Sequence, residues 1–100
     1  MSRLKLHEEL CELLGKRNVY FQPPESVKIC YPAIVYSRNK IDNTFANNQV
    51  YTTRNGYTVT VIDKDPDSEL VEKMTKFPTA KWTRHYVSDN LNHDVFNIYY

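Results

Sequence analysis

The sequence predicts an α+β fold, in which two helices pack on a mostly antiparallel β-sheet of four to five strands. Two segments place apolar residues at three- and four-residue spacing, which is typical of helices with one buried face. Other segments alternate apolar and polar residues and are rich in β-branched and aromatic side chains, which favours strands. The chain has 100 residues, so we expect a single domain over residues 1–100.

The first helix is expected over residues 2–15, where leucines recur along one side. Ser2 is suited to cap its start, and Gly15 to end it in the left-handed conformation. His7 projects into the apolar side, where we interpret it as a half-buried imidazole with a hydrogen-bond partner rather than as a ligand or a switch. The charged face opposite contains Glu8, Glu9 and Glu12.

Three strands are expected next. Residues 19–22 suit a short edge strand, because Pro23 and Pro24 cannot continue a ladder of backbone hydrogen bonds. Residues 31–41 and 56–63 are the clearest strands, since both combine β-branched residues with tyrosines.

Residues 42–56 are predicted to form a long loop between two antiparallel strands. Four asparagines interrupt any apolar period in this segment, and Asn55-Gly56 suits a turn into the next strand. Loops of this length inside a compact domain are usually functional or disordered. The loop also carries apolar side chains that could be buried against a neighbouring molecule, namely Phe45, Val50 and Tyr51.

Asp63, Asp65 and Asp67 alternate just before the second helix, which is expected over residues 66–76. They do not complete a calcium loop, because serine and methionine stand where that loop needs glycine and a bidentate glutamate. They also lack the spaced acid and lysine of a metal-dependent nuclease. We therefore predict that Asp65 is the N-cap of the helix, with Ser68 as the competing cap.

The last two strands are expected at residues 80–87 and 94–100, joined by a loop over residues 88–93. Trp82, Arg84 and Tyr86 would share one face of the first of these strands. We interpret Trp82 as a core residue with an arginine at its rim, the alternative being a stacking platform for nucleic acid. The predicted core contains Leu10, Leu14, Ile34, Val59, Val61, Leu70, Met74, Trp82, Phe96 and Ile98.

The composition and the residue spacing argue against several classes of protein. The formal net charge of +1 argues against a protein that grips phosphate backbone over a broad surface. Two glycines are too few for a glycine-rich phosphate loop, and no apolar run is long enough to span a membrane. The histidines and cysteines lack zinc-site spacing. Cys11 and Cys30 are expected as buried thiols, with a disulfide between them as the alternative.

Tyrosine is abundant, with 8 among 13 aromatic residues, which indicates strands and interfaces. Three segments in combination then resemble small tail-terminator, or tail-completion, neck proteins of long-tailed bacteriophages. The resemblance covers roughly residues 19–100 and rests on the segments "YPAIVYSRNKIDNTFANNQVY", "YTVTVIDKDPDSEL" and "WTRHYVSDNLNHDVFNIYY".

The resemblance implies a structural virion protein without catalytic, cofactor-binding or metal-binding residues. Six subunits would form a ring on the tail tube, end tube growth and meet the head–tail connector, while DNA passes through the lumen. Charges on the first helix would meet basic residues of the neighbour. The expected interface residues are Glu8, Glu9, Glu12, Arg38, Lys40, Phe45, Asn47, Asn48, Tyr51 and Arg54. The alternatives are a head-side stopper or joining protein of the same neck and, from a different class, a small metal-dependent nuclease.

Overall fold

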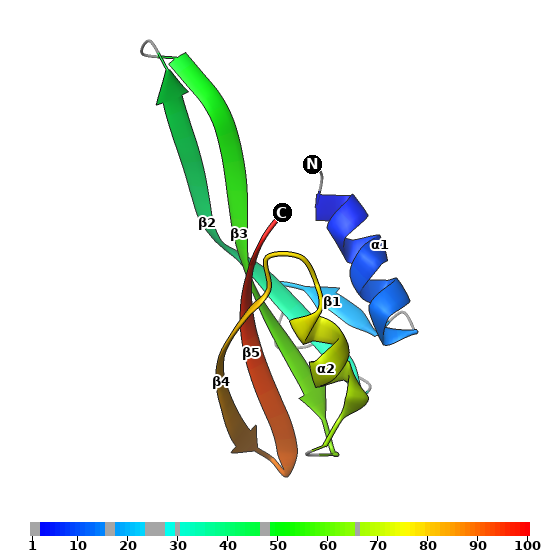
Figure 1. Cartoon of the computed structure of the whole chain (residues 1–100). Coiled ribbons are helices and arrows are strands. Elements are labelled where there is room, and N and C mark those ends of the chain that lie inside the picture. The colour runs from blue at the N-terminus through cyan, green and yellow to red at the C-terminus, as the bar shows by residue number, and fades with distance from the viewer. Residues whose placement is uncertain (1–2, 16–17, 24–27, 30, 47–48, 66) are drawn as a thin grey trace.

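The computed structural model describes residues 3–15, 18–23, 28–29, 31–46, 49–65 and 67–100, with the backbone alone at 40–46 and 49–54. The elements in chain order are α1 (Arg3–Leu14), β1 (Val19–Phe21), β2 (Ala33–Ala46), β3 (Gln49–Asp63), α2 (Glu69–Thr75), β4 (Lys81–Ser88) and β5 (Leu91–Tyr99). Two helices lie on one side of a five-stranded sheet (Figure 1). The predicted α+β class is confirmed.

The strand order in the sheet is β1-β2-β3-β5-β4. β1 runs parallel to β2, and every other neighbouring pair is antiparallel. The sheet is therefore mostly antiparallel, as predicted, with the parallel contact at one edge and β4 at the other. None of the described helices is long and apolar enough to cross a membrane.

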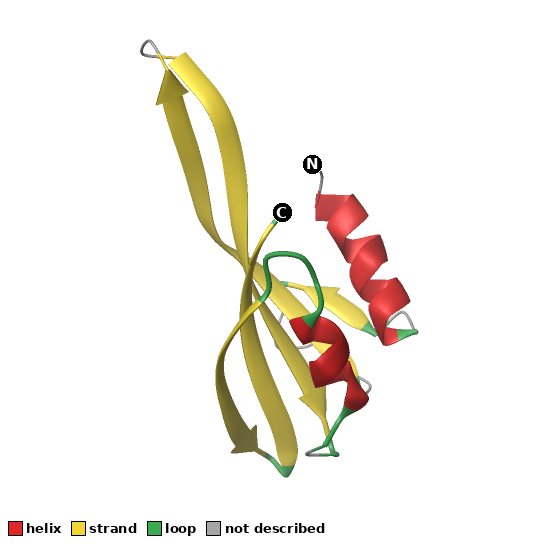
Figure 2. Cartoon of the chain, in the orientation of Figure 1, coloured by secondary structure: helices red, strands yellow, loops and turns green. Residues whose placement is uncertain are grey.

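The core lies between the two helices and one face of the sheet (Figure 2). The register places Tyr36, Val59 and Phe96 side by side across β2, β3 and β5, with their side chains under the helices. Nine of the ten predicted core residues are buried. The exception is Trp82, whose position on β4 is described with the candidate site.

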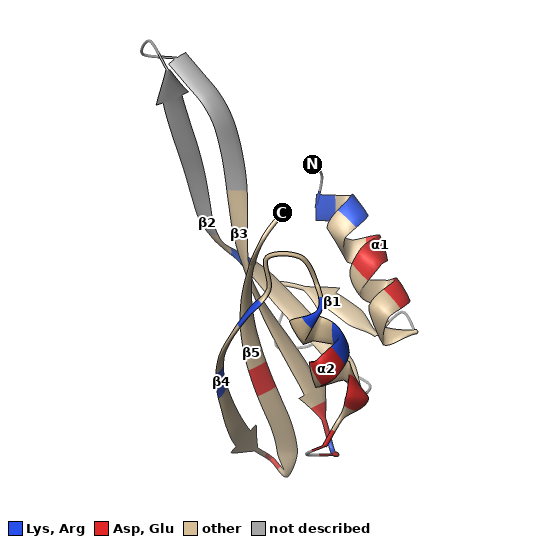
Figure 3. Ribbon diagram, in the orientation of Figure 1, with Lys and Arg blue, Asp and Glu red and all other residues tan. Residues whose placement is uncertain are grey.

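The first helix is held by packing rather than by its charges. Its first turn contains no acidic residue and its last turn no basic one, and Figure 3 shows basic residues near its start and acidic residues further along. This order opposes the helix dipole. Burial of Leu6 and Leu10, both with 0% exposure, supplies the stabilisation instead.

Several local predictions around α1 are confirmed. Gly15 has φ +77 and its N–H donates to the carbonyl of Cys11 at 2.9 Å, which is the left-handed helix end that glycine favours. His7 is half-buried, with Nδ1 2.8 Å from the hydroxyl of Tyr36. Cys11 is buried, whereas Ser2 and Cys30 lie outside the described residues.

The long loop predicted at 42–56 is wrong, because β2 and β3 continue through most of it as a paired hairpin. The register joins Asp42 to Arg54 and Thr44 to Thr52. Asn55 and Gly56 are ladder residues of β3, not a turn. The β-branched and aromatic residues between the asparagines favour a strand, and cross-strand pairing outweighs the weak propensity of asparagine. Asn47 and Asn48 lie outside the described residues.

We call the paired residues 40–46 and 49–54 the arm. Figure 1 shows the arm projecting beyond the body of the domain. The chain extends 51 × 27 × 23 Å with a radius of gyration of 14.7 Å, compared with about 13 Å for a compact domain of this length. The molecule is therefore a compact body with one elongated projection.

The predicted helix cap is also corrected. α2 begins at Glu69, and its N-cap is Ser68, whose Oγ accepts from the N–H of Leu70 at 3.3 Å. The same hydroxyl donates to Oδ2 of Asp63 at 2.7 Å. Asp65 instead accepts from the N–H of Asp67 at 2.9 Å, which is a turn of the kind that aspartate forms with its own backbone. This turn delays the helix by three residues.

Candidate assembly interface

β4 is an exposed edge strand. All eight of its residues, Lys81–Ser88, are exposed, and the strand has a neighbour, β5, on one side in the described sheet. The predicted loop at 88–93 is shorter than expected, because Asp89 and Asn90, with φ 52 and φ 62, make the turn and β5 already begins at Leu91. Aspartate and asparagine tolerate this left-handed conformation better than most residues.

A bulge in β4 separates two residues that were predicted to share a face. The register shifts between Trp82, which pairs with Phe96, and Arg84, which pairs with Val95. Thr83 is the extra residue. Because Phe96 lies under the helices and Val95 is next to it in the strand, Trp82 and Arg84 lie on opposite faces of the sheet.

Trp82 lies on the helix side of the sheet but beyond the core. Its side chain is 49% exposed, so its assignment to the core is wrong. Its Nε1 donates to Oδ1 of Asp94 at 3.2 Å, and Asp94 is buried in the neighbouring strand. The sequence pattern correctly indicated the face, but the edge position of β4 leaves the ring open to solvent.

Arg84 and Tyr86 form a stack on the opposite, helix-free face. The guanidinium Cζ of Arg84 lies 5.1 Å from the centroid of the Tyr86 ring. The other ring in the stack is His93, whose centroid is 4.6 Å from that of Tyr86 at an interplanar angle of 12°. Such contacts hold large, partly exposed side chains in one arrangement, which suits a contact surface.

The predicted basic interface residues lie at the base of the arm or on it. Arg38 is exposed, and its Nη2 donates to the hydroxyl of Tyr57 at 3.4 Å. Four of the predicted interface residues lie on the arm, where the structure describes the backbone alone: Lys40, Phe45, Tyr51 and Arg54. The structure therefore places these residues on a common projection, two of them on each strand.

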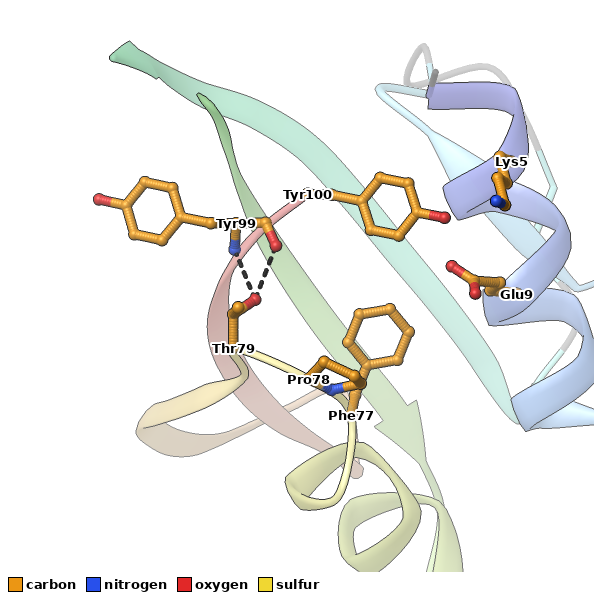
Figure 4. A pocket seen from close by; sticks show the side chains of 7 residues that line it. All are labelled: Lys5, Glu9, Phe77, Pro78, Thr79, Tyr99 and Tyr100. Atoms are coloured by element: carbon orange, nitrogen blue, oxygen red, sulfur yellow. Dashed lines mark hydrogen bonds between the residues drawn. The ribbon is translucent and has the colours of Figure 1, made fainter. Parts of the chain in front are cut away.

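The predicted acidic face of α1 is only partly correct. Glu8 and Glu12 are exposed, whereas Glu9 is half-buried and its Oε2 is buried without a hydrogen-bond partner. Glu9 faces the C-terminal Tyr100 across a cavity (Figure 4). The spacing of the glutamates could not indicate that Glu9 is more buried than Glu8 and Glu12. Its burial depends on Tyr100, which lies at the other end of the sequence.

The cavity between α1, the segment after α2 and the end of β5 has a volume of about 280 Å³. The hydroxyl of Thr79 donates to the carbonyl of Tyr99 at 2.6 Å, and the Tyr99 N–H donates back to that hydroxyl at 3.0 Å. Sequence reasoning missed this site, although the C-terminal pair of tyrosines was a signal for it. The lining residues are Lys5, Glu9, Phe77, Pro78, Thr79, Tyr99 and Tyr100.

Tyr100 interacts with Glu9 in this cavity. Burial, together with the hydrogen bond and the charge of Glu9, raises the pKa of Tyr100 to about 12. Its ring also lies 6.5 Å from that of Phe77, centroid to centroid. The C-terminus is thus fixed to both α1 and the loop after α2.

No protein-family model and no curated protein matches this chain.

The aspartates before α2 are engaged in local structure. Asp63 accepts from the Asp65 N–H at 3.2 Å through one oxygen and from Ser68 through the other. Among the residues that the structure describes, no three His, Cys, Asp or Glu side chains come together as a metal site requires. The exposed surfaces of the described residues present an open strand edge and stacked rings.

Proposed function

We propose that this chain is a structural virion protein of a long-tailed phage. It caps the tail tube as a ring, ends tube growth and forms the joint to the head connector. The observation that carries the proposal is the separation of two unlike contact surfaces. The arm projects from the body at one place, and the exposed strand β4 borders the sheet at another (Figure 1).

A closed ring needs two different patches on each subunit, because each subunit meets its neighbour head to tail. β1 pairs only with Ile34–Tyr36 of β2, and β5 pairs only with Gly56–Asp63 of β3. In the described pairings neither strand reaches the arm, so both outer edges of the arm are open. β4 is open along one side as well. Open edges accept further strands.

The chemistry of the two patches also supports association. Trp82, Tyr86 and Val87 are exposed on β4, and aromatic contacts supply most of the affinity in many interfaces. The exposed glutamates Glu8 and Glu12 can meet basic residues of a neighbour, but exposed charge pairs contribute only about 0–1 kcal/mol each. The stoichiometry of six and the tail tube and connector as partners follow from the sequence resemblance.

Deletion of the gene in its phage tests the proposal. If the protein is a terminator, its deletion leaves tail tubes of irregular, extended length that do not join heads. If the protein is a head-side stopper, the alternative within the neck, its deletion leaves tubes of normal length beside heads that lose their DNA. Electron microscopy of the lysate separates these results. Normal infectious particles, or labelled protein located on the capsid shell, would overturn the proposal.

A further inference from the structure

The cavity at the C-terminus contains an acceptor that nothing in the described chain uses. Oε2 of Glu9 is buried and has no hydrogen-bond partner, although the carboxylate interacts with the hydroxyl of Tyr100. A buried polar atom without a partner costs free energy. A ligand that donates a hydrogen bond to this oxygen would remove that cost.

The walls of the cavity specify the rest of the ligand. Phe77, Pro78 and Tyr100 contribute apolar surface, and Figure 4 shows the Phe77 and Tyr100 rings on the same side of the Glu9 carboxylate. Aromatic walls beside a carboxylate favour an alkyl chain that ends in a cation. A volume of about 280 Å³ has room for four methylene groups and an ammonium group.

We propose that this cavity binds one alkylammonium group, as carried by the lysine side chain of a partner protein, with its ammonium on Glu9. The same chemistry could come from a free diamine. Lys5 lines the cavity as well, and its positive charge opposes every cation that enters, so a ligand with two charges is opposed more than a ligand with one. The single charge of a lysine side chain is therefore favoured over the two charges of a diamine. The inference does not depend on the proposed function.

The test is an NMR titration of the full chain with n-butylammonium, n-butanol and 1,4-diaminobutane. We expect saturable shifts of the Thr79, Tyr99 and Tyr100 amide signals with n-butylammonium, at least about 10-fold weaker binding of n-butanol, and weaker binding of the diamine. Equal binding of the alcohol and the ammonium ion would overturn the site. Tighter binding of the diamine would overturn the lysine assignment.

Two matched variants locate the charge. Glu9→Gln keeps an oxygen that can accept from Tyr100 but removes the anion, and we expect it to weaken n-butylammonium binding at least about 10-fold. Glu12→Gln removes the same charge from an exposed position of the same helix and is expected to leave binding unchanged. Equal loss in both variants would mean that only the overall charge of α1 matters. If Glu9→Gln fails to fold, the comparison of n-butanol with n-butylammonium on the unaltered chain still tests the proposal.

Discussion

The indole Nε1 of Trp82 lies 3.2 Å from Oδ1 of Asp94, across the last pair of strands in the sheet. Asp94 is buried, whereas Trp82 is half exposed. The exposed indole therefore supplies a hydrogen-bond donor to a carboxylate that is buried. This hydrogen bond links the edge strand β4 to a buried side chain of β5.

We expect Asp94→Ala to lower the free energy of unfolding by about 1–3 kcal/mol, because it removes a hydrogen bond to a charged group and leaves a gap. Urea unfolding measured by circular dichroism gives the value. Glu12→Ala, on an exposed face of α1, is the control and should change stability by no more than about 0.5 kcal/mol. Equal effects of the two changes would show that the contact is not stabilising.

Ser68 and Asp65 can be compared directly as helix caps. Ser68→Ala should cost about 0.5–2 kcal/mol, because it removes the acceptor for the Leu70 N–H. Asp65→Ala should cost less, since Asp65 holds an exposed turn. Thermal unfolding of both variants under the same conditions provides the comparison. A larger loss for Asp65→Ala would restore that residue as the cap.

The arm should be separable from the body. Asn43 pairs with Thr53 in the register, so Asn-Gly in place of residues 43–53 joins Asp42 to Arg54 through a two-residue hairpin turn. We expect this shortened protein to fold, because the replacement retains every residue of the described core cluster. Under the proposed function it should fail to complement the deleted gene. Full complementation would show that the arm is dispensable for assembly, and an unfolded product would show that the arm belongs to the body.

Tyr100 should titrate late. Its pKa is raised to about 12, so the protonated phenol is favoured in the folded state. The stabilisation is present below the ordinary tyrosine pKa of about 10 and is lost as the pH rises from there through about 12. Ultraviolet absorbance follows the ionisation, and Tyr100→Phe identifies the signal, because burial also raises the pKa of Tyr36. In Glu9→Gln the Tyr100 pKa should fall, since the carboxylate contributes to the shift; an unchanged value would exclude that contribution.

Much of the core could be predicted from local periodicity. Side chains alternate between the two faces of a strand, so the pattern along residues 56–63 already assigned Val59 and Val61 to the core, and both are buried. In α1, Leu10 and Leu14 followed from helical spacing in the same way. The left-handed end at Gly15 is equally local, because it depends on the conformational freedom of one residue.

The sequence by itself therefore determined the helices, the main strands, most of the core and the fold class, because these depend on residues close together in the chain. The tertiary structure decided the rest. Whether Trp82 is covered depends on the strand order, which leaves β4 at the edge, and the face of Arg84 depends on a bulge in the pairing with β5. The surroundings of Glu9 depend on Tyr100, ninety-one positions further along the chain. Each of these features depends on a segment that is distant in sequence: a pairing partner, a sheet edge or a cavity wall. Local propensity therefore cannot predict them.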